Sequence, residues 1–261
     1  MSLKIALTIA GSDPSGGAGI QADLKTFHQR KVYGMSVITL VTVQNTRTMS
    51  KVSFLDPELV TGQLQTVLDD LTPDAAKIGA LGSAAVIRAV AKAARKFTFP
   101  LVVDPVMISK HGMFLMQKDA VKIFVTDLLP HADLLIPNVQ EAGVLSGRPV
   151  RNEKEMREAA RALKDLGAEA ILIKGGHLRG DALDLLYWRD RFHVFRAPRI
   201  RTVHTHGTGC TYSAVITAEV AKGADWPRAI HTAKRFITRA IETSPKLGGG
   251  CGPVNHHAKI D

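Results

Sequence analysis

The sequence predicts a three-layer α/β fold, in which a central, mainly parallel sheet is covered by helices on both faces. Short apolar runs of strand length alternate with amphipathic stretches of helix length along the 261 residues, as in chains built from βα units. No proline-, glycine- or serine-rich linker interrupts this rhythm, so residues 1–261 are predicted to form one domain. The loops after the apolar runs are polar and rich in glycine, which places the chemistry at the carboxyl ends of the strands.

The apolar runs and the helix-start signals give the expected elements in order. Strands are predicted at residues 4–9, 35–43, 75–78, 101–103, 134–136 and 170–173, followed by a more irregular pair at 183–187 and 192–195. Helices are predicted to begin near Gly17, Asp56, Ser83, Lys118, Glu141, Glu153, Thr208 and Pro227. Three of these starts have a capping residue, namely Ser83, Asn138 or Asn152.

The chain is basic, with a formal net charge of +10, which first suggests a nucleic-acid partner. The densest basic group, residues 189–201, alternates basic with apolar residues, as a strand or ribbon with a solvated outer face does. Aromatic stacking residues and a recognisable nucleic-acid-binding module are both missing from the sequence. We therefore expect no nucleic-acid partner, and the positive field suits an anionic substrate instead.

Composition also indicates where the protein works. Hydrophobic residues make up 45% and charged residues 22% of the chain, which is typical of a globular protein and excludes disorder. The two cysteines, Cys210 and Cys251, lack the spacing of a disulfide framework or a four-cysteine zinc site. The first apolar run is too short for a signal peptide, and no run reaches the roughly 20 apolar residues that cross a bilayer. We expect a soluble, cytoplasmic protein with no membrane partner.

The glycine loop after the first predicted strand has two interpretations. Gly17, Gly19 and Ala22 match the relaxed fingerprint G-x-G-x-x-A, which indicates a nicotinamide-dependent enzyme. That fingerprint needs an acidic residue at the end of the second strand to hold the ribose, and the sequence has Gln44 there. The loop is also longer than a dinucleotide turn, so a dinucleotide site is disfavoured. The sequence has no Gly-Lys dipeptide, which excludes a P-loop.

A second glycine-rich segment, Gly207-Thr208-Gly209-Cys210, precedes a helix of small residues. Bare backbone amides and the positive end of a helix form a nest that binds anions. Cys210 falls in the first turn, where the helix field is expected to lower its pKa and allow it to accept a proton. The alternative is a buried cysteine beside a glycine-dependent helix start.

His204, His206 and Cys210 are also residue types that bind metals. We discount a metal site because a strand that ends in a glycine turn points these side chains by different routes, and no fourth ligand is evident. His256 and His257 are expected to lie in a solvated tail rather than in a metal site.

Polar residues at further strand ends have the chemistry of a nucleotide site. Asp104 and Glu141 are placed to hold Mg²⁺, which binds triphosphates through one or two carboxylates. Each also has a structural alternative, since Asp104 precedes a proline turn and Glu141 can cap a helix by reaching back to Asn138. Lys174, followed by two glycines, puts a cation where a triphosphate can lie.

Together and in this order, the motifs resemble the ribokinase-like superfamily and, within it, the hydroxymethylpyrimidine/phosphomethylpyrimidine kinases of thiamine biosynthesis. The matching segments are residues 10–23 (AGSDPSGGAGIQAD), 43–46 (VQNT), 77–79 (KIG), 104–107 (DPVM), 137–138 (PN) with Glu141, 174–177 (KGGH) and 207–211 (GTGCT). The resemblance covers nearly the whole chain, and its first and last segments are specific to the subfamily.

The resemblance implies an ATP-dependent, Mg²⁺-using kinase that phosphorylates 4-amino-5-hydroxymethyl-2-methylpyrimidine and then its monophosphate, and it suggests a homodimer. The residues implied to bind the pyrimidine or to shape its pocket are Gly11, Ala18, Asp23, Gln44 and Met107. Those implied near the nucleotide are Asn138, Lys174 and His177, with Asp104 and Glu141 organising the metal ion. Those implied to form the anion hole are Gly207, Thr208, Gly209 and Cys210, with Cys210 as the base.

The sequence departs from the family pattern at two places. Ala80 stands where the family often has methionine, which reshapes one wall of the pyrimidine pocket. After Met107 the family usually has serine-glycine, whereas this chain has Lys110-His111-Gly112-Met113-Phe114. A pyridoxal kinase on the same fold therefore stays open as an alternative. A nicotinamide-dependent oxidoreductase and a nucleotide-binding module without chemistry are the alternatives from other classes.

Overall fold

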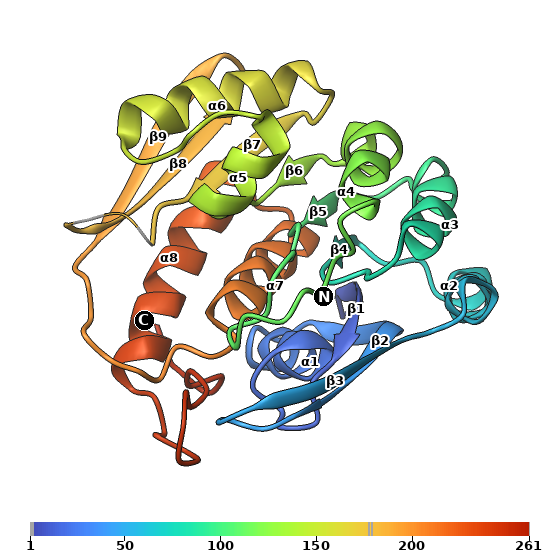
Figure 1. The fold of residues 1–261 in the computed structure, drawn as a ribbon, viewed down its shortest axis with the longest axis horizontal. Helices are drawn as coiled ribbons and strands as arrows, with labels where there is room; N and C mark the ends of the chain where they lie inside the picture. Colours follow the sequence, from blue (N-terminus) through green and yellow to red (C-terminus); the bar gives the residue numbers. More distant parts are fainter. Residues whose placement is uncertain (1–2, 177, 179, 261) are drawn as a thin grey trace.

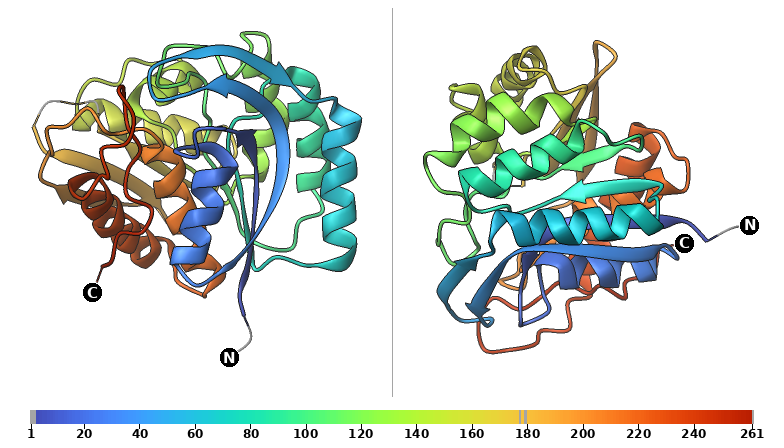
Figure 2. Two further views of the ribbon diagram at one scale, coloured as in Figure 1. Left: turned by 90° about the horizontal axis from the view of Figure 1, so that it is seen from below. Right: turned by 90° about the vertical axis from the view of Figure 1, so that its right-hand side faces the viewer.

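The computed structural model describes residues 3–176, 178 and 180–260, and a mixed sheet runs through its centre (Figure 1). The strand order is β3-β2-β1-β4-β5-β6-β7-β8-β9. The pairs between β2 and β7 are parallel, whereas β3, β8 and β9 pair antiparallel to their neighbours. Helices lie on both faces of this sheet (Figure 2), so the predicted three-layer α/β fold is confirmed.

The bounds of the elements are as follows. The strands are β1 (Ile5–Ser12), β2 (Tyr33–Gln44), β3 (Met49–Phe54), β4 (Ala75–Ile78), β5 (Leu101–Val103), β6 (Leu134–Leu135), β7 (Ala170–Lys174), β8 (Ala182–Trp188) and β9 (Arg191–Ala197). The α-helices are α1 (Gly19–Gln29), α2 (Pro57–Asp70), α3 (Ala84–Ala94), α4 (Ala120–Ile123), α5 (Val139–Ser146), α6 (Glu153–Asp165), α7 (Thr208–Ala221) and α8 (Trp226–Glu242). A π-helical turn, η1 (Phe124–Leu128), and a 3₁₀ turn, η2 (Leu129–His131), continue α4.

Strand alternation assigns side chains to the two faces of the sheet. In β7, Ile171 and Ile173 belong to the apolar cluster on the face covered by α5 and α6, whereas Leu172 belongs to the cluster formed with α7 and α8 on the other face. Successive strand side chains point to opposite faces, and both faces of β7 are covered, so the strand is apolar throughout. This double coverage explains why an unbroken apolar run predicted a strand here.

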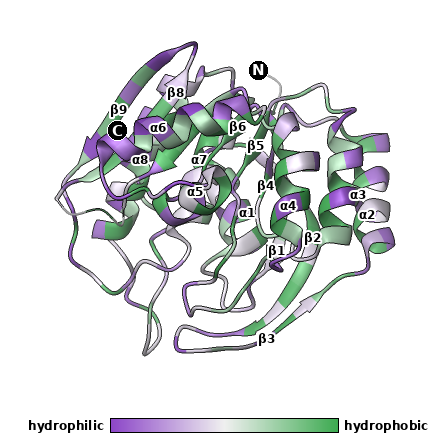
Figure 3. Ribbon diagram, turned by 45° about the horizontal axis from the view of Figure 1, so that its top comes forward, coloured by the Kyte–Doolittle hydropathy of each residue, from purple (hydrophilic) through white to green (hydrophobic). Residues whose placement is uncertain are grey.

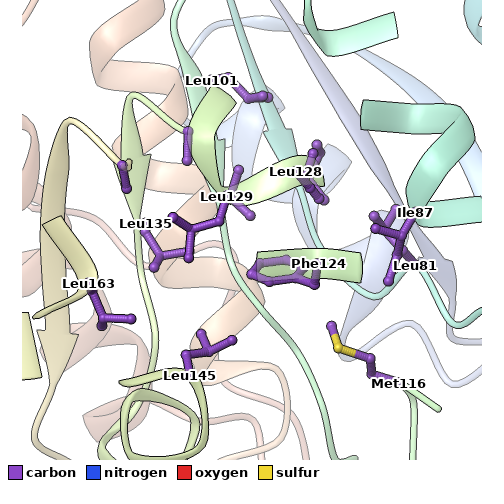
Figure 4. Close-up of a cluster of buried hydrophobic side chains, with 14 of the residues drawn as sticks. Leu81, Ile87, Leu101, Met116, Phe124, Leu128, Leu129, Leu135, Leu145 and Leu163 are labelled. Atoms are coloured by element: carbon purple, nitrogen blue, oxygen red, sulfur yellow. The ribbon is translucent and has the colours of Figure 1, made fainter. Parts of the chain in front are cut away.

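The largest cluster of buried apolar side chains lies under α3, η1 and α6 (Figure 4). Phe124 projects from η1 into the middle of the cluster and is 1% exposed. Leu81, Leu128 and Leu135 surround it in Figure 4. The cluster fixes the helices of this face onto the strands whose ends form the site described below.

The predicted helix starts agree with the structure to within two residues. Ser83 and Asn152 cap α3 and α6 by accepting the backbone N–H groups of Val86 and Glu155. Asn138 caps α5 and forms a capping box with Glu141, so the structural alternative for Glu141 is confirmed. The cap moves the start of α5 two residues before the predicted one, to Val139.

β3, which pairs antiparallel with the end of β2, was not predicted from the sequence. An Asx turn connects the two strands, since Asn45 Oδ1 accepts the N–H groups of Arg47 and Thr48 at 2.8 and 3.0 Å. This ribbon extends β2 beyond the core, and Val43 at the end of β2 is 57% exposed. Its pattern has too few buried positions to resemble a core strand, which is why it was not predicted.

The basic segment at residues 189–201 forms the second half of a hairpin. Arg189 and Asp190 turn between β8 and β9 with φ of 49° and 57°, and Arg191 and Arg196 of β9 are exposed. Figure 3 shows hydrophilic residues on the outer surface at β9 and α6. The predicted ribbon with a solvated face is confirmed. None of the helices in the described part of the chain has the length and apolar character that crossing a bilayer requires.

The segment after α8 packs against the loop before α7 instead of extending into solvent. His206 and Val254 are joined by a backbone hydrogen bond of 3.2 Å, and His256 is only 6% exposed. Burial lowers the pKa of His256 to about 4. The expectation of a solvated tail is therefore wrong for His256, since its side chain is in the protein interior.

We predict that Phe124→Ala destabilises the protein by about 3–5 kcal/mol, because it leaves a cavity in the main apolar cluster. The measurement is urea unfolding followed by circular dichroism. Phe114, which is 57% exposed, is the matched control, since Phe114→Ala removes the same atoms from solvent. Equal losses in the two variants would contradict this account of the core.

Candidate active site

A cavity of about 680 Å³ opens where the parallel strands end. Most of the residues predicted from the sequence line it. They are Gly11, Ala18, Gln44, Asp104, Met107, Asn138, Glu141, Lys174, Gly207, Thr208, Gly209 and Cys210. Asp23 does not line the cavity. His177 lies outside the described residues.

Two glycine loops, far apart in sequence, meet at this cavity. Gly207 is the N-cap of α7 and has a left-handed backbone with φ of 77°. A Cβ on Gly207 would overlap the carbonyl oxygen of Gly17 in the first loop, so only glycine allows the contact. No side chain caps α7, which leaves the positive end of this helix at the cavity wall. The geometry suits an anion, as the sequence predicted.

Cys210 lies in the first turn of α7, and its thiol is near Lys77 and the backbone N–H of Gly19. Burial raises the pKa of this thiol to about 11, and the charge of Lys77 opposes the effect only in part. The expectation that the helix field lowers this pKa is wrong, because desolvation of the thiolate outweighs the nearby positive charges. Cys210 is a neutral thiol at neutral pH in this structure.

Asp23 lies below the cavity and not in its wall. Its side chain is fully buried; Oδ1 accepts from Lys77 Nζ at 2.7 Å and Oδ2 accepts from Thr8 Oγ1 at 2.6 Å. Both carboxylate oxygens are therefore occupied from within the core. That Asp23 binds the pyrimidine stays a prediction, and in this structure its carboxylate is paired within the core. Its partner Lys77 is the residue that reaches the cavity.

Lys174 joins the strand-end carboxylates. Its Nζ donates to Asp104 Oδ1 at 2.7 Å, and its charge also acts on Glu141. Burial raises the pKa of Glu141 to about 7; Asp104 adds to the effect and Lys174 opposes it. Gly209 packs close to both Asp104 and Lys174, where a Cβ would lie 3.6 and 3.7 Å from their terminal atoms. The loop and first helical turn at residues 207–210, here called the anion cradle, therefore form one wall of the cavity together with Asp104, Glu141 and Lys174.

The first loop is held by Asp13. Oδ1 accepts from the backbone and hydroxyl of Ser15, and Oδ2 accepts from the backbone N–H groups of Gly17 and Ala18. His206 Nε2 lies 2.7 Å from the same Oδ2. Burial opposes ionisation of Asp13, but the bonds from His206 and Ser15 outweigh it and lower the pKa to about 2. Asp13 is therefore an anion at any ordinary pH.

A further charged cluster, which was not predicted from the sequence, lies beside Lys174, whose partner across the β7–β8 pair is Asp184. Asp184 Oδ2 accepts from Lys234 Nζ at 2.7 Å and from the hydroxyl of Tyr212 at 3.0 Å, and all three residues line the cavity. Asp184 Oδ1 also accepts the N–H of Gly175, in the turn after β7, at 3.2 Å. One feature of the sequence could have revealed this cluster: a charged residue stands inside an otherwise apolar strand. Asp184 in β8 and Lys77 in β4 are both residues of this kind.

The two departures from the family pattern differ in their position relative to the cavity. Ala80 lines the cavity and is 9% exposed, so the smaller side chain does reshape its wall. His111 does not line it; its Nε2 lies 3.3 Å from the carbonyl oxygen of Thr46, and its ring centroid lies 6.3 Å from that of His206.

We predict that Gly207→Ala is more destabilising than Gly147→Ala. Both positions have left-handed backbones, but a Cβ at Gly147 meets no atom within 4 Å. Gly147→Ala should cost about 1 kcal/mol of strain, and Gly207→Ala about 1–3 kcal/mol more, because the two loops must separate. Chemical denaturation measures both, and equal values would exclude a tight contact between the loops.

Comparisons with known proteins agree with this geometry. The family model described as phosphomethylpyrimidine kinase matches residues 13–255. A hydroxymethylpyrimidine/phosphomethylpyrimidine kinase from Streptomyces coelicolor is 46% identical over 97% of this chain and 94% of its own length.

Solved structures show the same fold. The pyridoxal kinase from Staphylococcus aureus in complex with AMP-PCP and pyridoxal superposes with a TM-score of 0.91 at 36% identity, covering 99% of this chain and 95% of that one. The phosphomethylpyrimidine kinase from Clostridium difficile has a TM-score of 0.82 at 40% identity, with 91% and 99% covered. The fold is therefore ribokinase-like, and this chain belongs to the phosphomethylpyrimidine kinase family.

Proposed function

We propose that this protein transfers the γ-phosphoryl group of ATP to the 5-hydroxymethyl group of 4-amino-5-hydroxymethyl-2-methylpyrimidine, and then a second phosphoryl group to the monophosphate, in thiamine biosynthesis. The proposal is supported by the relatives named hydroxymethylpyrimidine/phosphomethylpyrimidine kinase. The use of ATP is supported by a related kinase solved with AMP-PCP and another solved with ADP.

The observation that carries the proposal is the continuity of the cavity. Gln44 and Met107, which the resemblance assigns to the pyrimidine, line the same space as Asn138 and Lys174, which it assigns to the nucleotide. Cys210, in the first turn of α7, lines this space too. A hydroxymethyl group can therefore meet a triphosphate at the N-terminus of α7.

In the first reaction, the hydroxymethyl oxygen forms a bond to the γ-phosphorus while the bond from that phosphorus to the bridging oxygen of ADP breaks. Charge on the transferred phosphoryl oxygens is stabilised by the amides of the cradle and by Lys174. Cys210 acts as the base in its thiolate form, which is a small fraction at neutral pH because burial raises the pKa of the thiol to about 11. The ammonium of Lys77 stabilises this thiolate, and the thiolate takes up the alcohol proton as the new P–O bond forms. In the second reaction the acceptor is a phosphate that is already largely ionised, so no base is needed.

We propose that Asp104 and Glu141 hold Mg²⁺ with the phosphates. The donor set fits, because Asp104 and Glu141 are two buried carboxylates in the wall of the same cavity, and the ion pair of Lys174 is with Asp104. The ion supplies neutralisation of phosphate charge when it is bound.

We predict that this environment makes stability depend on pH. The pKa of Glu141 is raised from 4.5 to about 7 on folding, so the folded protein binds more protons and stability falls as the pH rises through this range. Glu141→Gln should remove the fall in the free energy of unfolding that Glu141 causes between pH 4.5 and 7, as measured by urea unfolding over this pH range. Unchanged pH dependence in the variant would show that Glu141 titrates normally.

We predict that Cys210→Ala slows the first phosphorylation about 100-fold or more, the usual size of a general-base contribution, and slows the second by much less. Single-turnover rapid quench with each acceptor measures both steps. Cys251→Ala is the control, since Cys251 does not line the cavity and both rates should stay unchanged. Equal losses for the two acceptors in Cys210→Ala would argue against its role as base.

A pyridoxal kinase is the second candidate. It is supported by the solved relatives from Staphylococcus aureus and Bacillus subtilis, which are named pyridoxal kinases, and by the space that Ala80 leaves in the wall. Comparing kcat/KM for the pyrimidine alcohol and for pyridoxal decides between the two candidates.

We also propose that the enzyme acts in the cytoplasm as a homodimer. The resemblance to the family supports both statements, and the exposed apolar residues Val41 and Val43 on β2, 40% and 57% exposed, offer a surface for a second copy.

A further inference from the structure

One imidazole nitrogen connects three segments around the pyrimidine end of the cavity. His206 Nε2 lies 2.7 Å from Asp13 Oδ2 and 3.1 Å from Gln44 Nε2. We propose that His206, held by Asp13, orients the amide of Gln44 so that the amide nitrogen donates a hydrogen bond to an acceptor atom in the substrate's ring. His206 would be a positioning residue that determines specificity. This inference rests on the proposed function, since it concerns the same site.

The proton of the Asp13–His206 bond belongs to the imidazole. The carboxylate of Asp13 already accepts from the backbone and hydroxyl of Ser15 and from the N–H groups of Gly17 and Ala18. A carboxylate that accepts from four donors has no proton to give. The hydrogen therefore lies on His206 Nε2, whatever the state of the other ring nitrogen.

A protonated Nε2 fixes the orientation of the Gln44 amide. The N–H of the imidazole cannot accept a bond from the amide nitrogen, so two donors would face each other at 3.1 Å. A half-turn of the amide exchanges its oxygen and nitrogen at nearly the same positions. The amide oxygen then shares the single Nε2 hydrogen with Asp13 Oδ2, in a bifurcated hydrogen bond whose shorter arm goes to the carboxylate, and the amide nitrogen takes the other position.

The amide nitrogen of Gln44, in the position that does not face His206, needs a hydrogen-bond acceptor from outside the protein. The terminal amide atom there is buried and has no hydrogen-bond partner among the described residues, although Gln44 lines the cavity. Buried polar groups are nearly always paired, so the missing acceptor is best supplied by a bound molecule. A heteroaromatic ring with a nitrogen acceptor, such as an aminopyrimidine, has the matching chemistry.

The position of His206 is fixed by its backbone hydrogen bonds and by packing, so the side chain cannot shift to accommodate a ligand that fits poorly. Its backbone N–H donates to Gly252 and its carbonyl accepts from Val254. A Cβ on Gly17 would lie 2.5 Å from Cδ2 of the ring, so the imidazole is packed directly on the first loop. The orientation of Gln44 is therefore set before the substrate binds.

The test compares the pyrimidine alcohol with analogues in which one ring nitrogen at a time is replaced by C–H. The wild-type enzyme should lose about tenfold or more in kcat/KM with the analogue that lacks the acceptor, because the buried donor is left unpaired. Gln44→Glu and His206→Leu should show a similar loss with the normal substrate but little further loss with that analogue. The KM for ATP should stay constant, and His206→Gln, which keeps an N–H donor, should restore the discrimination.

Several outcomes would overturn the inference. One is a wild-type enzyme that has the same kcat/KM for the pyrimidine alcohol and for all of its analogues. This measurement does not depend on the folding of any variant. Another is a folded His206→Leu variant, checked by circular dichroism, that keeps the wild-type discrimination or raises the KM for ATP by the same factor. A wild-type enzyme active only on pyridoxal would refute the proposed function instead, and the same nitrogen-to-carbon series in the pyridine ring would then decide the role of His206.

Discussion

The contact between Gly17 and Gly207 is the constraint on which the site depends. It brings the loop after β1 and the loop before α7 together with no side chain between them. The first loop then presents Ala18 and Gly19 to the cavity, and the second presents Gly209 and Cys210. An acceptor molecule and a phosphate donor can meet only because these two backbones touch. Glycine is required at Gly207 for geometry and not for flexibility, since any Cβ there overlaps the first loop.

Buried ion pairs provide the charge of this cavity. Lys77 pairs with Asp23, Lys174 with Asp104 and Lys234 with Asp184, each at 2.7 Å, and all three lysines line the cavity. Such pairs contribute little net stability, because desolvation offsets their attraction. Their effect here is to hold ammonium groups in fixed positions in an apolar surrounding, where an anionic ligand needs little reorganisation of the protein. Burial opposes the charge of Lys77 and Lys174, but the neighbouring carboxylates Asp23 and Asp104 outweigh it and raise the pKa of both lysines.

Features with local signals could be predicted from the sequence, and features that depend on distant partners could not. The parallel strands, the caps at Ser83, Asn138 and Asn152 and the nest at Gly207 all follow from neighbouring residues. The burial of Cys210 and the withdrawal of Asp23 into a pair with Lys77, 54 residues away, depend on packing between α1, β4 and α7. For Cys210 the helix field was foreseen, but desolvation was larger and decided the direction of the pKa shift.

The backbone pairing of His206 with Gly252 and Val254 has a consequence for how the enzyme is made. All strands of the sheet end by Ala197, and the helices α7 and α8, which cover one face of the sheet, are synthesised after them. Folding during synthesis begins from the N-terminal part of a chain. A nascent chain of this kind therefore lacks one helical layer of its sheet until α8 has been made, and His206 gains its backbone partners only when residues near Val254 have left the ribosome.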